Sequence, residues 1–499
     1  MIIEILAARI MAPYFGTSIY VWTAVISVTL LSLAVGYFAG GKAADKANSP
    51  NVLYSLITTS GIYLFLDLFI KKAILSQSID MGLRAGAFIS TAVLFALPLL
   101  LLGAVTPLTV KLYTKNMETL GSGVGVLYFF STAGSFLGTV LAGYALLPVF
   151  GVSKILIFTA GALIVIPCLY FVIFAKNYKT LLLMILLLVS PFFMAEDRAR
   201  TKMINGVTWD ELYKTDSFYA RLKVVEINKL NRFLFMDGIN QGGMDIKNGY
   251  SQVFYPYAVE ALSRILAREV NKALVIGLGP GTIPIAFART GAQVDVVEID
   301  PKVVLAYKDY FARKELENNI KIFVEDGRSF IKKSDAKYDV VVLDVFVGDS
   351  SPWHLLTLES FQDIKRVIGY RGALVINFVG LPADPSNAKI IISIHKTLLE
   401  VFPYAGLFNC TQSTGDAPKN IYFTGCIRKP EETFSLNMGI PSMFQEPLQN
   451  AIKDRLESAQ EGAFILTDEY NPVDMFTASA KEAWRRTITD SVERDAILD

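Results

Sequence analysis

Three acidic residues stand at the ends of apolar segments in the middle of the sequence: Glu298, Asp326 and Asp344. Each segment is a short apolar run of the kind that forms a buried parallel strand. The carboxyl ends of such strands meet at one rim of an open α/β sheet, where ligands bind. Carboxylates at that rim could accept hydrogen bonds from a ribose diol, hold a cationic amine or take up its proton. Residues that only cap a strand end would give the same pattern without a ligand.

A glycine-rich turn follows the first strand of this series, Ala273–Ile276. Its glycines are Gly277, Gly279 and Gly281, and the apolar periodicity then predicts a helix over Thr282–Arg289. Glycines let the backbone turn tightly against a ligand, and the start of a helix offers free N–H groups. Alone, this pattern fits NAD, FAD or an S-adenosylmethionine-type ligand. A dehydrogenase is disfavoured because it gives Asp326 and Asp344 no role.

Strands and helices alternate from Phe254 to about Ile427, which predicts a doubly wound, Rossmann-like sheet. Short alternating strands stand before it, among them Leu222–Ile227 and Phe233–Phe235. These elements resemble the class I methyltransferase-like fold, and within it the spermidine synthase (polyamine aminopropyltransferase) family. Phe233–Gln241 resembles that family's L-x-L-D-G-x-x-Q element, and Tyr250 follows at the distance expected from it.

The resemblance implies roles for the residues that match the family's motifs. Asp344 would be the catalytic proton acceptor. Gln241 would lie at the amino-acid tail of the co-substrate, and Glu298 would bind its ribose hydroxyls. Asp326, with Gly327 beside it, would accept a hydrogen bond from the adenine amino group. The three glycines of the turn complete the expected co-substrate site.

The acceptor side departs from the family pattern. Soluble spermidine synthases carry an Asp-Glu pair before the tyrosine, where this chain has Ile246 and Lys247. A site with fewer carboxylates attracts a dication less strongly, so the resemblance leaves the acceptor amine open.

A second departure follows Asp344, where the next acid, Asp349, comes two residues late. The run from Asp349 to Glu359 resembles instead a loop of the membrane-fused subgroup of the family. His354 in this loop is either a second base near neutral pH or a residue that orders the loop. We expect Tyr250, Asp349 and His354 to bind the substrate.

The composition of the 499 residues separates an apolar half from an ordinary globular half. Hydrophobic residues make up 53%, and the formal net charge of +1 argues against a nucleic-acid partner. The 3 Cys and 2 His show no metal-ligand spacing, so no metal site is expected. We expect a transmembrane helical domain at 1–195, a small β-domain at 196–245, a Rossmann-like catalytic domain at 246–430 and a helical extension at 431–499.

Residues 1–195 contain six to seven apolar segments, of which the first is too short to cross a bilayer. Glu4 and Arg9 lie in that first segment and are read as interfacial or bundle contacts, and Gly134-x-x-x-Gly138 predicts close helix packing. This half resembles the membrane domain fused to spermidine synthase-like proteins. The expected segments are Ile2–Pro13, Ile19–Gly41, Leu53–Ile70, Ala85–Leu112, Val124–Val149, Ile155–Ala175 and Thr180–Met194.

The resemblance therefore implies a multi-pass protein of the cell membrane with a cytoplasmic catalytic domain. It would transfer an aminopropyl group from decarboxylated S-adenosylmethionine to a small amine and release methylthioadenosine, without a prosthetic group. Soluble family members suggest a homodimer. The sequence leaves open another S-adenosylmethionine enzyme on the same scaffold, such as a methyltransferase or sulfonium lyase, and a transporter or sensor that only binds the ligand.

Overall fold

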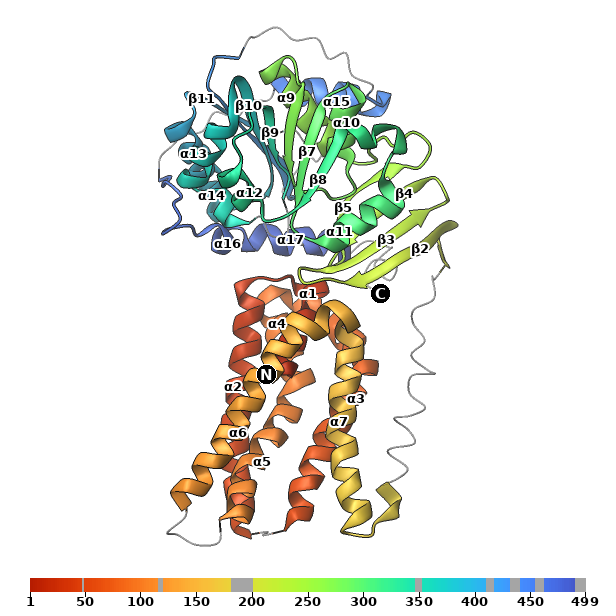
Figure 1. Cartoon of the computed structure of the whole chain (residues 1–499), viewed down its shortest axis with the longest axis vertical. Coiled ribbons are helices and arrows are strands. Elements are labelled where there is room, and N and C mark those ends of the chain that lie inside the picture. The colour runs from red at the N-terminus through yellow and green to blue at the C-terminus, as the bar shows by residue number, and fades with distance from the viewer. Residues whose placement is uncertain are drawn as a thin grey trace. The chain divides into compact units, whose positions relative to one another are not determined.

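The computed structural model describes residues 1–46, 49–114, 120–180, 201–345, 352–409, 417–430, 440–453 and 462–489 (Figure 1). The chain divides into two compact units. The first comprises Met1–Arg198 with Asp216–Phe218, and the second comprises Ala199–Thr215 with Tyr219–Asp499.

The first unit is helical. Within the described residues, four helical runs are long and apolar enough to cross a membrane: Ile19–Lys46, Pro50–Tyr113, Leu120–Leu146 and Val149–Ile173. The expected segment Thr180–Met194 lies, after its first residue, outside the described residues. The helices are α1 (Ile2–Phe15), α2 (Ile19–Lys46), α3 (Pro50–Ser78), α4 (Gly82–Thr91), α5 (Leu97–Tyr113), α6 (Leu120–Leu141) and α7 (Leu147–Ile173). Single-turn elements are η1 (Ile79–Met81), η5 (Tyr178–Thr180) and the π-helical η2 (Ala92–Ala96) and η4 (Ala142–Leu146).

Close helix packing occurs between α2 and α5. A Cβ atom at Gly36 would lie 2.2 Å from the carbonyl oxygen of Leu100, and one at Gly40 would lie 2.5 Å from Cα of Ala104. A Cβ at Gly134 would meet nothing within 4 Å. Gly138, the second glycine of the expected motif, would place a Cβ 3.2 Å from Cγ1 of Ile2 on α1, but the contacts with backbone atoms are those of Gly36 and Gly40.

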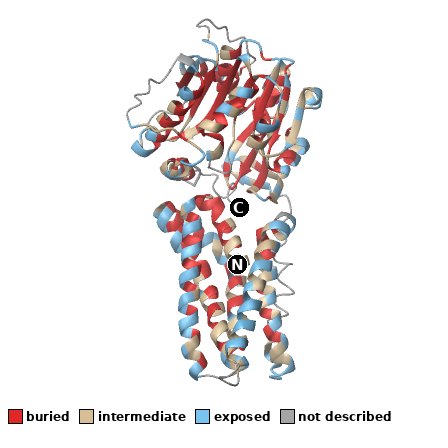
Figure 2. Ribbon diagram, turned by 60° about the vertical axis from the view of Figure 1, so that its left-hand side comes forward, coloured by how far each residue is buried: buried red, intermediate tan, exposed pale blue. Residues whose placement is uncertain are grey.

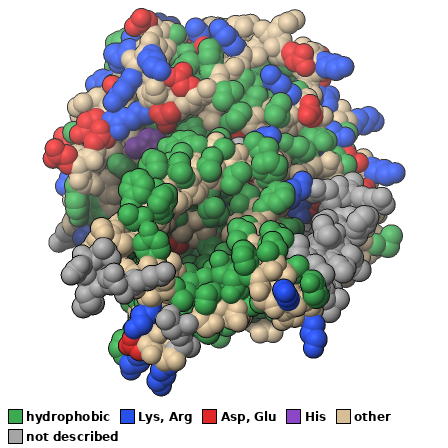
Figure 3. Space-filling view, turned by 60° about the horizontal axis from the view of Figure 1, so that its bottom comes forward, with side chains coloured by type: hydrophobic (Ala, Val, Ile, Leu, Met, Phe, Trp, Pro, Cys, Tyr) green, Lys and Arg blue, Asp and Glu red, His purple; other side chains and the backbone are tan. Residues whose placement is uncertain are grey.

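The outward surface of the helices is strongly apolar. Phe129, Phe130 and Phe136 on α6 are 67%, 68% and 66% exposed. A space-filling view of the chain shows hydrophobic side chains gathered over a broad area of the face that is drawn (Figure 3). Such a surface is unusual for a protein surrounded by water and is typical of helices that face lipid.

The second unit begins with a five-stranded antiparallel sheet whose strands follow chain order. Burial does not alternate strictly along these strands, since β3 buries the four consecutive residues Leu222–Val225. The strands are β1 (Thr201–Ile204), β2 (Val207–Asp216), β3 (Arg221–Ile227), β4 (Asn231–Met236) and β5 (Ile239–Asp245).

A seven-stranded sheet follows, in the order β11-β12-β10-β9-β6-β7-β8. Strands β8, β7, β6, β9 and β10 are parallel, and β12 is antiparallel to both β10 and β11. The order reverses at β6, which lies between β7 and β9, and this is the switch point at which open sheets bind ligands. The strands are β6 (Lys272–Ile276), β7 (Gln293–Glu298), β8 (Ile320–Val324), β9 (Tyr338–Leu343), β10 (Ile368–Gly380), β11 (Tyr404–Phe408) and β12 (Lys419–Cys426).

Helices cover both faces of this sheet (Figure 1). Its central strands are buried on both sides, and Val275, Val342 and Val375 are fully inaccessible (Figure 2). The expected Rossmann-like domain with a preceding β-sheet is thus confirmed. The helical elements are α9 (Tyr255–Ala267), α10 (Thr282–Arg289), α11 (Pro301–Ala306), η6 (Tyr307–Phe311), η7 (Lys314–Asn319), α12 (Gly327–Lys333), η8 (Trp353–Leu355), α13 (Leu358–Val367), α14 (Pro385–Val401), α15 (Ser442–Lys453), α16 (Val473–Phe476) and α17 (Ala478–Thr489).

Candidate active site

A cavity of about 530 Å³ lies at the carboxyl ends of the parallel strands of the second unit. Its wall includes the glycine turn after β6, Glu298 at the end of β7, Asp326 after β8 and Asp344 after β9. The three acids predicted from separate strand ends therefore meet in one cavity. Gln241, Gly327 and His354 line it too.

The glycine turn holds two strands in close contact. Gly277 has a φ of +96°, and a Cβ atom there would lie 2.1 Å from the carbonyl oxygen of Asp344. Asp344 donates its backbone N–H to Ile276 at 3.0 Å, so the two strand ends are tied at this point. Gly279 lines the cavity, whereas Gly281 is not among the lining residues and is the N-cap of α10, with φ +77°. Glycine at these positions thus shapes the floor of the cavity.

The carboxylate of Glu298 is buried and oriented by the backbone. Its two oxygens accept hydrogen bonds from the N–H groups of Leu278 at 3.0 Å and Asp300 at 2.9 Å. Burial raises the pKa of Glu298 to about 7, although these N–H donors favour the charged form. Each carboxylate oxygen has a further lone pair, so Glu298 can still accept hydrogen bonds from a vicinal diol.

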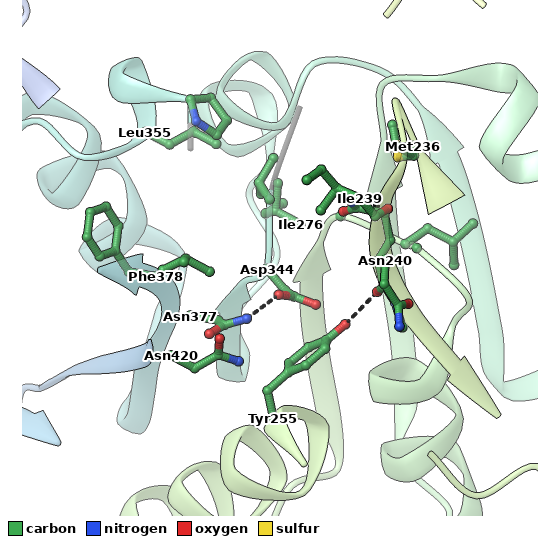
Figure 4. A pocket seen from close by; sticks show the side chains of 18 of the residues that line it. Met236, Ile239, Asn240, Tyr255, Ile276, Asp344, Leu355, Asn377, Phe378 and Asn420 are labelled. Atoms are coloured by element: carbon green, nitrogen blue, oxygen red, sulfur yellow. Dashed lines mark hydrogen bonds between the residues drawn. The ribbon is translucent and has the colours of Figure 1, made fainter. Parts of the chain in front are cut away.

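Asp344 lies between two polar side chains (Figure 4). Asn377 on β10 donates its Nδ2–H to Asp344 Oδ1 at 2.8 Å. The hydroxyl of Tyr255 on α9 donates to the carbonyl oxygen of Gln241 at 3.0 Å and lies close enough to the Asp344 side chain to interact with it. Burial raises the pKa of Asp344 to about 6, while the hydrogen bonds from Asn377 and Tyr255 oppose this rise. A carboxylate with this pKa can accept a proton near neutral pH.

Asp326 and His354 form a second polar pair at the cavity. One oxygen of Asp326 caps α12 by accepting the Ser329 N–H at 2.8 Å. The other oxygen lies 3.6 Å from Nε2 of His354. Both side chains remain partly exposed, so they can meet a ligand at the mouth of the cavity.

Two predicted substrate residues are not among the side chains gathered in the cavity. Tyr250 lies outside the cavity lining because its ring packs against the Arg289 guanidinium, 4.3 Å from the ring centroid. Tyr255, five residues further on, is the tyrosine that reaches the cavity. Asp349 lies outside the described residues.

Several residues of the cavity were not predicted. Asn377 is a polar residue within the otherwise apolar run of β10, a signal that the sequence did contain. The C-terminal helix α17 adds Lys481 and Trp484, which no local pattern connects with the rim of the sheet. Other unpredicted lining residues include Asn240, Phe378, Lys419 and Asn420.

Comparisons with known proteins converge on this domain. The family model described as "Spermine/spermidine synthase domain" matches residues 254–430. A polyamine aminopropyltransferase of Vibrio vulnificus is 33% identical over 171 residues, which cover 33% of this chain and 55% of that protein. An N-terminal histidine N-methyltransferase of Emericella nidulans is 36% identical over 143 residues, or 28% of this chain and 24% of that protein. The chain thus spans about a quarter to a half of the length of these two relatives.

Among solved structures, a probable spermidine synthase from Corynebacterium glutamicum is 20% identical with a TM-score of 0.43, covering 51% of this chain and 96% of that one. The domain matched by the family model contains the glycine turn, all three rim acids and the strand that carries Asn377. Residues 254–430 of the chain are therefore similar to the spermine/spermidine synthase family.

Proposed function

We propose that the second unit transfers an aminopropyl group from decarboxylated S-adenosylmethionine to an amine acceptor and releases methylthioadenosine. The observation that carries this proposal is the position of Asp344. Its buried carboxyl lies in the same cavity as Glu298 and the glycine turn, which suit the ribose and the adjacent part of a nucleoside.

In the proposed reaction the acceptor nitrogen attacks the methylene carbon beside the sulfonium sulfur. The new N–C bond forms as the C–S bond breaks. The electron pair of the C–S bond stays on the sulfur, which becomes neutral in the leaving methylthioadenosine. Before the attack, the Asp344 carboxylate takes a proton from the acceptor ammonium, which frees the nitrogen lone pair that forms the new bond. The protein's contribution is to align nitrogen, carbon and sulfur and to supply this base.

The activity is expected to rise with pH through about 6, because the charged form of Asp344 must accept the proton. Asn377→Ala removes a hydrogen bond that favours the charged form, so the inflection should move to higher pH. The measurement is the pH profile of methylthioadenosine release by both proteins. An unshifted profile in the variant would contradict the role of Asn377 in tuning this base.

Glu298→Gln is expected to weaken methylthioadenosine binding by about 10- to 100-fold, since hydrogen bonds to a charged acceptor contribute roughly 1.5–3 kcal/mol. Calorimetric titration gives this affinity directly. Glu325→Gln is the matched control, because Glu325 follows the neighbouring strand but lies outside the cavity lining, where it bonds Ser329 and Lys333. If the two variants bound methylthioadenosine equally well, Glu298 would not be a residue that binds the ribose.

A second candidate function is methyl transfer from S-adenosylmethionine. The similarity to the Emericella methyltransferase favours it. The cavity wall also contains Lys419 and Lys481, which a ligand carboxylate could approach, although Lys481 already bonds Asp474 at 2.9 Å. Two other cationic residues of the second unit, Lys247 and Arg221, do not line the cavity.

Calorimetric titration of the purified full chain with decarboxylated and intact S-adenosylmethionine separates the two candidates. Tighter binding of the decarboxylated ligand supports aminopropyl transfer. Tighter binding of the intact ligand, with the preference reduced in Lys481→Met, supports methyl transfer and refutes the first proposal.

We further propose that the first unit is a multi-pass anchor in the cell membrane, with the catalytic domain on the cytoplasmic side, where S-adenosylmethionine-type ligands are made. The four long apolar runs and the exposed phenylalanines of α6 support the membrane assignment. A homodimer is proposed by analogy with soluble members of the family. Carbonate extraction of membranes and light scattering in detergent test these two points separately.

A further inference from the structure

Asp67 in α3 is a buried acid within the apolar helices of the first unit. It is 1% exposed, and among the described residues 1–180 it is the one charged side chain that is fully buried. Neither of its carboxylate oxygens has a hydrogen-bond partner in the described part of the chain. Ionisable residues inside membrane helices are costly and mark ion or substrate sites.

Ser90 in α4 is a second buried polar residue of this kind. Its side chain is fully inaccessible, and its Oγ has no hydrogen-bond partner among the described residues. A serine in a helix usually bonds the carbonyl one turn before it, as Thr91 beside it bonds Ala87 at 2.7 Å. The hydroxyl oxygen of Ser90 can therefore still form a hydrogen bond or bind a cation.

The helix register brings Asp67 and Ser90 to one level. Ser60 of α3 donates its hydroxyl to the Pro98 carbonyl at 3.1 Å, and Tyr63 donates to the Val93 carbonyl at 2.7 Å. Residue numbers rise along α3 as those of its partners fall along the run from α5 to η2. The two helical runs are therefore antiparallel. Asp67 lies one turn beyond Tyr63, and Ser90 lies one turn before Val93.

The nearest lysine on the same helix, Lys71, acts electrostatically on Asp67, but neither Asp67 oxygen has a hydrogen-bond partner in the described part of the chain. Lys71 lies one turn beyond Asp67, and its Nζ approaches Oγ of Ser153 on α7 at 3.4 Å. The π-helical turn Ala92–Ala96 begins two residues after Ser90. Such turns interrupt the regular hydrogen-bond ladder and occur frequently at functional sites.

An ionised carboxylate in this position would cost several kcal/mol unless a cation neutralised it. We propose that Asp67 and Ser90 form a binding site for a small monovalent cation, either an ammonium group or an alkali ion. The carboxylate supplies the charge and the serine hydroxyl supplies a neutral oxygen ligand. In the absence of the cation, a proton on Asp67 takes its place. This inference does not depend on the chemistry proposed for the second unit.

The test uses dicyclohexylcarbodiimide, an apolar reagent that modifies carboxyl groups when they are protonated and shielded from water. The full chain is labelled in detergent in choline chloride, and the modified peptides are found by mass spectrometry. Asp67 is expected to react, whereas Asp45, whose side chain is 78% exposed, is the internal control that does not. Asp67→Asn should lose this labelled peptide.

Sodium chloride or methylammonium chloride then replaces the choline chloride at constant ionic strength and pH. Labelling of Asp67 should slow about tenfold at roughly ten times the Kd of the cation, since only the vacant site reacts. Ser90→Ala should keep the labelling and lose much of the protection. The protecting salt tells an ammonium group from an alkali ion. Failure of Asp67 to react, or equal rates in all three salts, would overturn the proposal.

Discussion

Asp344→Asn is expected to lower amine-dependent turnover by about 10²–10⁴-fold, the usual contribution of a positioned general base. The amide has nearly the same shape as the carboxylate but cannot take the proton of the acceptor amine. Binding of methylthioadenosine should change little, because this product lacks the group that Asp344 deprotonates. Initial rates and calorimetric affinities of the same preparation give both values.

Asp335→Asn serves as the matched control for this substitution. Asp335 precedes the same strand, β9, but is exposed and lies outside the cavity. Its variant should retain full turnover. If Asp344→Asn also kept its turnover, Asp344 would be a structural residue, and the proposed base would have to be sought elsewhere.

Gly277→Ala is expected to abolish ligand binding and to destabilise the second unit. The added Cβ would lie 2.1 Å from the backbone oxygen of Asp344, a distance at which one of the two strand ends must move. The residue also has φ +96°, which costs an alanine roughly 1–2 kcal/mol. Thermal unfolding and methylthioadenosine titration measure the two effects.

Gly291→Ala separates the backbone strain from the steric clash. Gly291 has φ +89°, similar to Gly277, but a Cβ there would meet nothing within 4 Å. The control should therefore show only the modest loss of stability that comes from strain, with ligand binding intact. Equal behaviour of the two variants would mean that contact between the ends of β6 and β9 does not shape the cavity.

The rim of the sheet could be predicted because its determinants are local in the sequence. Strands β7, β8 and β9 each read as a short, mostly apolar run, and an acid at the end of such a run must reach the carboxyl end of the sheet. Glu298, Asp326 and Asp344 were found in this way, as was the glycine turn. The fold class followed from the same alternation of strands and helices.

The partners of these acids could not be predicted, because they depend on contacts between distant segments. Tyr255 reaches Asp344 through the packing of α9 beside β10, whereas Tyr250, which matches the family spacing, turns to Arg289. Asn377 faces Asp344 because β10 pairs with β9 in a register that the sequence does not specify.

The helices of the first unit show the same limit. The sequence pattern singles out Glu4 and Arg9 as charges within an apolar segment. The fully buried acid of the described residues 1–180 is instead Asp67, whose segment the sequence predicts only as an apolar helix. Hydropathy identifies a helix that can cross a membrane but not the face it buries. Likewise, the close contacts of Gly36 and Gly40 with α5 carry no stronger local signal than the glycines of α6.

The most direct test of the account is methylthioadenosine release by the full chain, supplied with decarboxylated S-adenosylmethionine, with and without a panel of mono- and diamines. The account predicts release that requires an amine, forms an aminopropylated product in equal amount and is lost in Asp344→Asn. Release without an amine, or turnover with intact S-adenosylmethionine alone and a methylated product, would contradict it.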